Sequence, residues 1–113
     1  MDGGAVDGGA RAEAVEAMGD LFRALATPVR LSIVMELSAA PRSVGELVEA
    51  LGVSQPLVSQ HLRVLRAARL VAVDQRQRER VYRLLDDHVR HIVGDAARHV
   101  AEHGRRPAGS TAG

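Results

Sequence analysis

The 113-residue chain contains no cysteine, which excludes disulfide bonds and any metal site that depends on thiolate ligands. It also contains no tryptophan, and its only Phe and Tyr residues are Phe22 and Tyr82, so a folded core has to be aliphatic. No run of eighteen apolar residues occurs, and the start of the chain lacks the basic and apolar regions of a secretory signal. These absences predict a single cytoplasmic domain with no membrane partner.

The charge of the chain is nearly balanced, with a net charge of +1, but it is distributed unevenly. Residues 54–84 hold seven arginines against two acidic residues and carry +5, whereas residues 1–53 hold four arginines against eight acids and carry −4. A basic block within a nearly neutral chain is typical of a face that binds a polyanion such as nucleic acid. Because a solvated charged surface produces the same pattern, the order of helices and strands has to decide between the two interpretations.

Apolar spacing and capping residues predict two helices in the first third of the chain. Residues 1–9 are rich in Gly and Asp, show no periodicity and are expected to form a disordered arm. Helical spacing of apolar residues predicts a first helix over 10–26. Thr27 as N-cap and Pro28 in the first turn begin a second helix that ends near Ser38. The second helix is expected to bury Leu31, Val34 and Met35 or Leu37.

Two further helices follow with only a short break between them. Ser43 to Glu46 matches a capping box, and Gly52 suits the residue that ends the third helix. The fourth helix opens with Ser54 as its N-cap and ends near Ala67. A short helix, a tight glycine turn and a second helix with a polar outer face form the helix-turn-helix pattern.

A β-hairpin and a last helix complete the predicted fold. Residues 70–74 and 80–84 are rich in Val, Tyr and Leu and predict two strands joined by an arginine-bearing tip at 75–79. Asp86 caps a last helix that runs to about His103. The order α-α-α-α-β-β-α is that of a mainly helical winged helix-turn-helix. The predicted divisions are a disordered arm at 1–9, a DNA-binding and dimerisation domain at 10–103, and a flexible tail at 104–113.

The exposed N-terminal half of the fourth helix carries polar side chains that suit base recognition in a major groove. The positive end of the helix dipole favours phosphate there, and arginines at the hairpin tip suit a phosphate or minor-groove contact. His61, the one histidine on this helix, is interpreted as a hydrogen-bonded structural residue rather than a base reader. The predicted DNA contacts are Gln55, Ser59, Gln60, Arg63, Arg66, Arg76 and Arg78.

The last helix carries the patterns Asp86-x-His88 and His99-x-x-Glu102. The eleven-residue step between the two histidines returns them to nearly the same face, about 16 Å apart along the axis. One ion cannot join both from a single helix, because histidine nitrogen binds zinc at about 2.0–2.1 Å. Two copies packed antiparallel would instead bring the first pair of one chain against the second pair of the other. The spacing therefore predicts two symmetric metal sites per dimer.

Two imidazoles and two carboxylates form a four-coordinate set that suits Zn²⁺, with Co²⁺ as a surrogate. Ni²⁺ usually prefers more ligands, and His91 and His103 on the same helix are candidates to supply them. Catalytic zinc keeps an open position beside three protein ligands, so four ligands argue against a zinc hydrolase. A metal-storage protein would not need the arginine-bearing hairpin.

Four segments together form a recognisable set of motifs: Leu25 to Leu31, Gly52 to Leu62, Leu65 to Val71 and Val81 to Leu84. Through them, over about residues 14–103, the chain resembles the ArsR/SmtB family of metal-responsive winged-helix repressors. The resemblance implies a homodimer held by the first and last helices, binding to operator DNA, and release when metal binds. It also implies that His99 links the metal to the end of the fourth helix through its second ring nitrogen.

Within that family, the pattern on the last helix resembles the zinc-sensing site. The cysteines that the family's other site needs before the third helix are replaced by Arg42, Ser43 and Val44, which argues against sensing through thiolates. The chain also has Arg69 and Gln77 at positions where the family frequently has glycine.

The sequence therefore predicts a repressor, not an enzyme, that binds operator DNA as a homodimer and is released by zinc or a related divalent metal. Two alternatives stay open. One is a nickel-responsive regulator, and the other is a metal-independent winged-helix regulator that acts with a partner protein.

Overall fold

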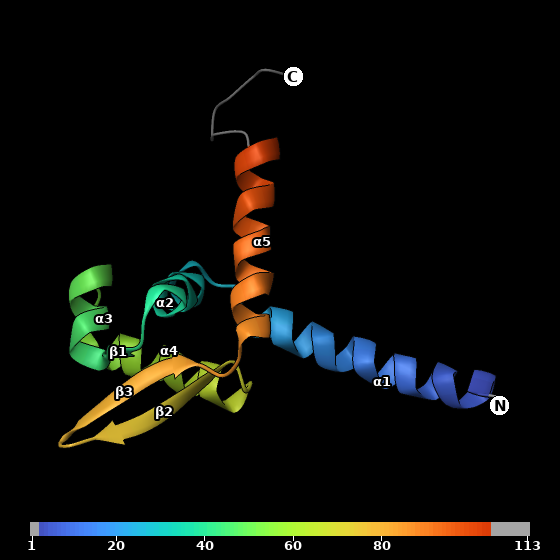
Figure 1. Ribbon diagram of the computed structural model, residues 1–113, viewed down its shortest axis with the longest axis horizontal. Helices are drawn as coiled ribbons and strands as arrows, with labels where there is room; N and C mark the ends of the chain where they lie inside the picture. The colour runs from blue at the N-terminus through green and yellow to red at the C-terminus, as the bar shows by residue number, and fades with distance from the viewer. Residues whose placement is uncertain (1–2, 105–113) are drawn as a thin grey trace.

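Two long helices project in different directions from a smaller body that contains the core (Figure 1). The computed structural model describes the backbone of residues 3–104 and the side chains of residues 8–104. The predicted order α-α-α-α-β-β-α is confirmed, with one short strand added before the third helix. The bounds are α1 (Gly3–Ala24), α2 (Pro28–Ala39), β1 (Arg42–Ser43), α3 (Val44–Leu51), α4 (Gln55–Ala67), β2 (Val71–Arg76), β3 (Glu79–Leu84) and α5 (Asp87–His103).

Side chains that accept hydrogen bonds from the first backbone N–H groups begin four of the helices, as the sequence predicts. Thr27 caps α2, Ser54 caps α4 and Asp86 caps α5. At α3 the capping box is complete, because the Ser43 N–H donates to Glu46 Oε1 at 2.8 Å and the Glu46 N–H donates to Ser43 Oγ at 3.2 Å. These local bonds fix where each helix starts.

Mostly aliphatic side chains from α2, α3, α4, α5 and the sheet form the core, as the composition predicts, with Tyr82 as the buried aromatic residue. On α2 the buried residues are Ile33, Val34 and Leu37. The expected burial of Val34 is confirmed, and of the two alternatives Met35 and Leu37 it is Leu37 that is buried. Leu31, which the sequence assigns to the core, is instead 39% exposed, and Met35 is 46% exposed. The reason is that both line a groove between α2 and α5 rather than the core itself.

The hairpin of β2 and β3 is longer than predicted, and a third strand lies beside it. The sheet order is β1-β3-β2, and both pairings are antiparallel. Arg76 pairs with Glu79, so only Gln77 and Arg78 remain in the turn, where the sequence predicts a five-residue tip at 75–79. The strand β1 is missing from the sequence prediction because two residues are too few to show an alternating pattern.

The first helix begins at Gly3, so the backbone of residues 3–9 is helical where the sequence predicts a disordered arm. Extending an existing helix by one residue costs far less than nucleating a new one, so a strong helix can continue through a segment of weak propensity. The tail predicted beyond Gly104 lies outside the described residues. None of the described helices combines the length and apolar character needed to cross a membrane.

Candidate DNA interface and metal centre

A cavity of about 390 Å³ lies between α4 and the outer half of β3. Its polar lining includes four of the predicted DNA contacts, which the fold therefore brings together: Gln55, Ser59, Arg63 and Arg66. The opposite wall is formed by Arg80 and Tyr82 of β3. We refer to this cavity, with its six polar lining residues, as the arginine groove.

Arg80 is a functional candidate that the sequence analysis missed. Its guanidinium carbon lies 5.9 Å from the centre of the Tyr82 ring, within the range of a cation–π interaction. Residues two apart on a strand face the same side, and the buried Tyr82 fixes which side faces α4. That period of two along β3 was the signal available in the sequence. The predicted contact Gln60 does not line the groove, and Arg76 and Arg78 lie at the hairpin end, beyond it.

The arginines of this face have no carboxylate partners in the part of the chain that the structure describes. The ion pairs among the described residues involve other arginines. One example is Arg83, whose Nε donates to Asp74 Oδ2 at 2.9 Å across the hairpin. Arg63, Arg66 and Arg80 therefore keep their positive charge available to an outside anion. Arginine forms charge-assisted hydrogen bonds with phosphate, often in bidentate geometry.

His61 lies on α4 but turns away from solvent toward α2. Arg30 Nη1 lies 3.3 Å from His61 Nδ1, and the histidine is only partly exposed. The interpretation of His61 as a hydrogen-bonded residue is confirmed.

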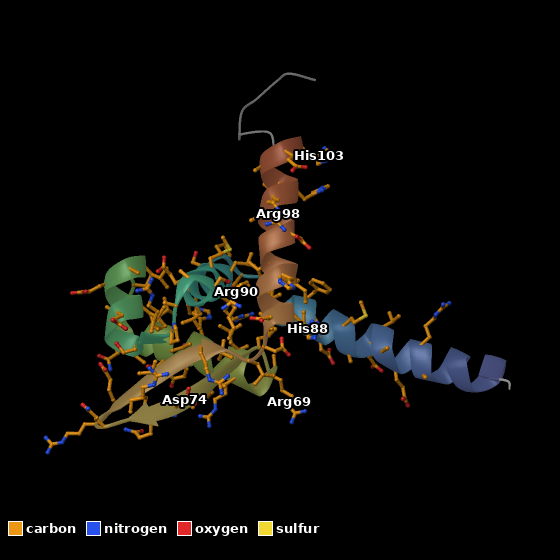
Figure 2. All side chains as sticks on the ribbon, in the orientation of Figure 1. Arg69, Asp74, His88, Arg90, Arg98 and His103 are labelled. Carbon is orange, nitrogen blue, oxygen red and sulfur yellow. The ribbon has the colours of Figure 1, made fainter. Side chains whose placement is uncertain are left out.

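The four predicted metal ligands lie on or beside α5, and all four are exposed in the single chain. Asp86 Oδ1 already accepts the Val89 N–H at 3.2 Å as the N-cap. Figure 2 shows His88 at the base of α5 and His103 at its far end, so the helix separates its first histidine from its last. Among the described residues of one chain, no three His, Cys, Asp or Glu side chains gather into a metal-binding group. A single chain does not join Asp86 and His88 to His99 and Glu102.

The far end of α5 carries a second possible donor beside His99. The rings of His99 and His103 lie one helical turn apart, with their centroids separated by 4.6 Å. His103 is thus close enough to enlarge a coordination shell that contains His99, as the nickel alternative requires.

Solvent-exposed apolar side chains lie on both projecting helices. Val15, Met18 and Phe22 of α1 are between 51% and 60% exposed. A groove of about 380 Å³ between α2 and α5 is lined almost entirely by apolar atoms. The radius of gyration, 17.2 Å, exceeds the value of about 13 Å for a compact chain of this length. Exposed apolar area on this scale is typical of a protein–protein interface. The groove residues are Leu31, Met35, Val93, Ala96, Ala97 and Val100.

Comparison with known proteins places these features in a family. Residues 27–73 match the family described as bacterial regulatory protein, arsR family. The HTH-type transcriptional repressor SmtB of Mycobacterium tuberculosis is 53% identical over 90 residues, which cover 80% of this chain and 67% of SmtB. This chain belongs to the arsR family. The membership agrees with the prediction of a regulator rather than an enzyme.

Other arsR-type proteins share the fold as well as the sequence. The HTH-type transcriptional regulator NmtR of Mycobacterium tuberculosis is 42% identical over 91 residues, covering 80% of this arsR-family chain and 75% of NmtR. A solution structure of apo-NmtR superposes with a TM-score of 0.71 at 39% identity, over 90% of this chain and 87% of that one. A homodimeric winged helix-turn-helix DNA-binding domain, Mb0332 of Mycobacterium bovis, superposes with a TM-score of 0.78 at 24% identity, over 82% and 86%. The winged helix-turn-helix prediction is confirmed.

Proposed function

We propose that this arsR-family chain is a transcriptional repressor that binds duplex operator DNA as a homodimer and leaves the DNA when a divalent metal, zinc in the first instance, binds. The observation that carries the DNA-binding part is the arginine groove, in which three arginines without carboxylate partners among the described residues and two polar side chains lie between α4, the recognition helix of this proposal, and the hairpin of β2 and β3. DNA as the ligand agrees with the cytoplasmic location expected from the sequence.

In this proposal the recognition helix enters the major groove with Gln55 and Ser59 at its leading end, where side chains read base edges. Arg63, Arg66 and Arg80 bind phosphates along the edge of the groove and fix the position of the helix. Arg76 and Arg78 extend the contact from the hairpin end.

A homodimer is supported by the apolar surfaces that one chain leaves exposed. The exposed apolar face of α1 and the apolar groove beside α5 both need a cover, and a second copy of the chain offers the same two surfaces in return. Such reciprocal burial is the usual arrangement of a twofold dimer. The structural relative from Mycobacterium bovis is itself a homodimer.

For the metal, the proposed ligands are Asp86 and His88 of one protomer with His99 and Glu102 of the other. Two imidazoles and two carboxylates match the donor types and coordination number of Zn²⁺, and all four are accessible on α5. Once bound, the ion supplies a strong crosslink between two helices. The ligand residues can switch DNA binding only if they close around the ion better in one dimer shape than in the other.

Two variants of the proposal differ in the metal step. In the nickel alternative His91 and His103 complete a larger shell, for which the short distance between His99 and His103 is the supporting observation. In the metal-independent alternative α5 serves only dimerisation, and a partner protein releases the DNA.

The test begins with DNA selected from a random-sequence duplex library by the purified full-length chain. Anisotropy of a selected duplex then gives the affinity without metal, with Zn²⁺, Ni²⁺ or Co²⁺, and after chelation. Zinc should lower the affinity by at least tenfold, and the chelator should restore it. Release by nickel alone would favour the nickel alternative, and an affinity unchanged by every metal would leave the metal-independent regulator.

Arg80→Gln tests the DNA-binding face itself. Loss of one phosphate contact should weaken binding to every duplex by a similar factor and reduce the slope of log affinity against log salt by about 0.9. Arg11→Gln removes the same charge from α1, outside the groove, and should leave the slope unchanged. Equal salt slopes in all three proteins would exclude Arg80 from the interface.

A further inference from the structure

We propose that Arg30 fixes the orientation of the recognition helix relative to α1 by donating hydrogen bonds to both, which makes it a positioning residue for DNA binding. The inference rests on the proposed function, because it matters only if α1 dimerises and α4 reads DNA. Its evidence is the set of three contacts that one guanidinium makes at the junction of α1, α2 and α4.

The first two contacts are to the end of α1. Arg30 Nε donates to the Ala24 carbonyl oxygen at 2.5 Å, and Nη2 donates to the Arg23 carbonyl oxygen at 3.4 Å. The last carbonyls of a helix lack intrahelical donors and carry the negative end of the helix dipole. The Arg30 guanidinium gives the Ala24 oxygen a donor, adds a second donor to the Arg23 oxygen, which already accepts the Ala26 N–H at 3.1 Å, and opposes their negative charge. Arg30 therefore closes the C-terminal end of α1.

The third contact is to the recognition helix. Arg30 Nη1 lies 3.3 Å from His61 Nδ1. Arginine can only donate, so the histidine nitrogen has to accept, which requires a neutral ring with its hydrogen on Nε2. His61 follows the predicted base reader Gln60 directly along α4, so the contact holds the part of the helix that faces the DNA.

The backbone of Arg30 is itself fixed. Its N–H donates to Thr27 Oγ1 at 3.1 Å as part of the α2 N-cap, so the residue sits in the first turn of a helix packed in the core. From this anchored position the side chain reaches back to α1 and across to α4. A movement of either helix has to stretch or break bonds to the same guanidinium.

Apart from the partly buried Leu21, which packs against the core near the same end, little else among the described residues constrains the direction of α1. The helix projects away from the body (Figure 1), and of its side chains from Gly8 onward only Ala24, at the last position, is buried. The angle of α1 is therefore set at its C-terminal end, where Arg30 lies. In a dimer held through α1, a small change of this angle is magnified along the helix. The two recognition helices must lie about 34–36 Å apart to enter successive major grooves.

The position of α1 relative to α4 can be followed as a distance between two spin labels. Because the chain has no native cysteine, labels attach only at cysteines that are introduced. Glu16→Cys on α1 and Ala67→Cys at the end of α4 place spin labels at two exposed positions. Mixing the doubly labelled chain with excess unlabelled chain leaves one labelled protomer per dimer, so electron–electron double resonance reports the distance between α1 and α4 within one protomer. This readout needs neither DNA nor metal, so it separates the role of Arg30 from the proposed function.

His61→Gln and His61→Asn form the matched pair. The Asn side chain can place an acceptor near the position of Nδ1, whereas the longer Gln side chain places its polar atoms near Nε2. In His61→Gln, the distance distribution should broaden, and affinity for the selected duplex should fall by about tenfold, as expected for one lost hydrogen bond to a charged group. In His61→Asn, both should stay near those of the unaltered chain.

Arg30→Lys keeps the charge but replaces the fork of donors by one ammonium group, which cannot reach α1 and His61 together. It should broaden the distance distribution as His61→Gln does. Unchanged distributions in Arg30→Lys and His61→Gln would overturn the proposal, whatever happens to DNA binding. Equal loss of affinity in His61→Asn and His61→Gln with a narrow distribution would also overturn it, because His61 would then act on the DNA itself.

Discussion

Arg69 and Gln77 hold the backbone in the left-handed region, with φ of 62° and 57°, where glycine is the least costly residue. Arg69 lies just after α4, and Gln77 opens the hairpin turn. These are the two positions where the sequence departs from the glycines common in the family, and the chain keeps a glycine-like backbone at both. A residue with a Cβ costs about 1–2 kcal/mol in this conformation, so the adjoining helix end and strand pair have to hold it.

Gln77 offers a stability test that does not disturb the arginines. Gln77→Gly and Gln77→Ala remove the same functional group, but only glycine fits a positive φ without strain. The glycine variant should be more stable than the alanine variant by about 1 kcal/mol, measured by urea unfolding, with the larger entropy of unfolded glycine reducing the difference. An alanine variant as stable as the glycine variant would show that the turn relaxes to another backbone conformation.

At the scale of the elements, the sequence predicts features that depend on neighbouring residues well, and it predicts features that depend on contacts between distant segments poorly. The cap of α3 joins Ser43 to Glu46, three residues away, so the sequence shows both partners side by side. The strand β1 forms only because it pairs with β3 at Val81 and Tyr82, and its own two residues contain no signal for this pairing.

The same limit explains the errors on α2 and in the groove. Helical periodicity shows that Leu31 and Met35 share an apolar face, but not that the face lies beside α5 instead of in the core. Arg80 joins the arginine groove because β3 lines the cavity on the side opposite α4, and spacing alone does not reveal that neighbour. The proposed metal ligands show the limit most clearly, because bringing them together requires a second chain. Their assignment stays a prediction.

Asp86 has two roles at the start of α5, a helix cap and a proposed metal ligand, and one substitution separates them. Asp86→Asn keeps a side-chain oxygen that caps as well as Asp, so urea unfolding of the metal-free protein should change little. The neutral amide is a weaker ligand than a carboxylate, so zinc affinity should fall by at least tenfold. Asp86→Ala should lose both, with the cap worth about 1 kcal/mol. Unchanged zinc affinity in the Asn variant would remove Asp86 from the proposed ligands.

At the scale of the whole molecule, the arrangement of the two projecting helices connects the proposed functions. The helix α5 and its N-cap carry the proposed metal ligands, α1 carries an exposed apolar face, and the body carries the arginine groove. Within one chain, α5 is tied to the end of α2 by the Arg90 Nε bond to the Ser38 carbonyl oxygen at 3.1 Å. In the proposed mechanism, a signal from the metal to the recognition helix would have two routes through the body, one along α2 and one through the junction at Arg30.

Met18→Glu tests the dimer on which both routes depend. Met18 is 54% exposed at the centre of the apolar face of α1, and a carboxylate there could be covered by a partner only at a large desolvation cost. Two copies of the side chain are affected per dimer, so the dissociation constant measured by sedimentation equilibrium should rise by at least about 100-fold. Binding to a two-half-site duplex and the absorption of four-coordinate Co²⁺ should fall together, because each requires two protomers. Ala17→Glu adds the same charge about 100° around α1 from Met18, at an exposed position outside the face formed by Val15, Met18 and Phe22, and should leave all three measurements unchanged. If Met18→Glu stays dimeric, or if the monomer still binds Co²⁺ with four ligands, the metal is not shared between two α5 helices.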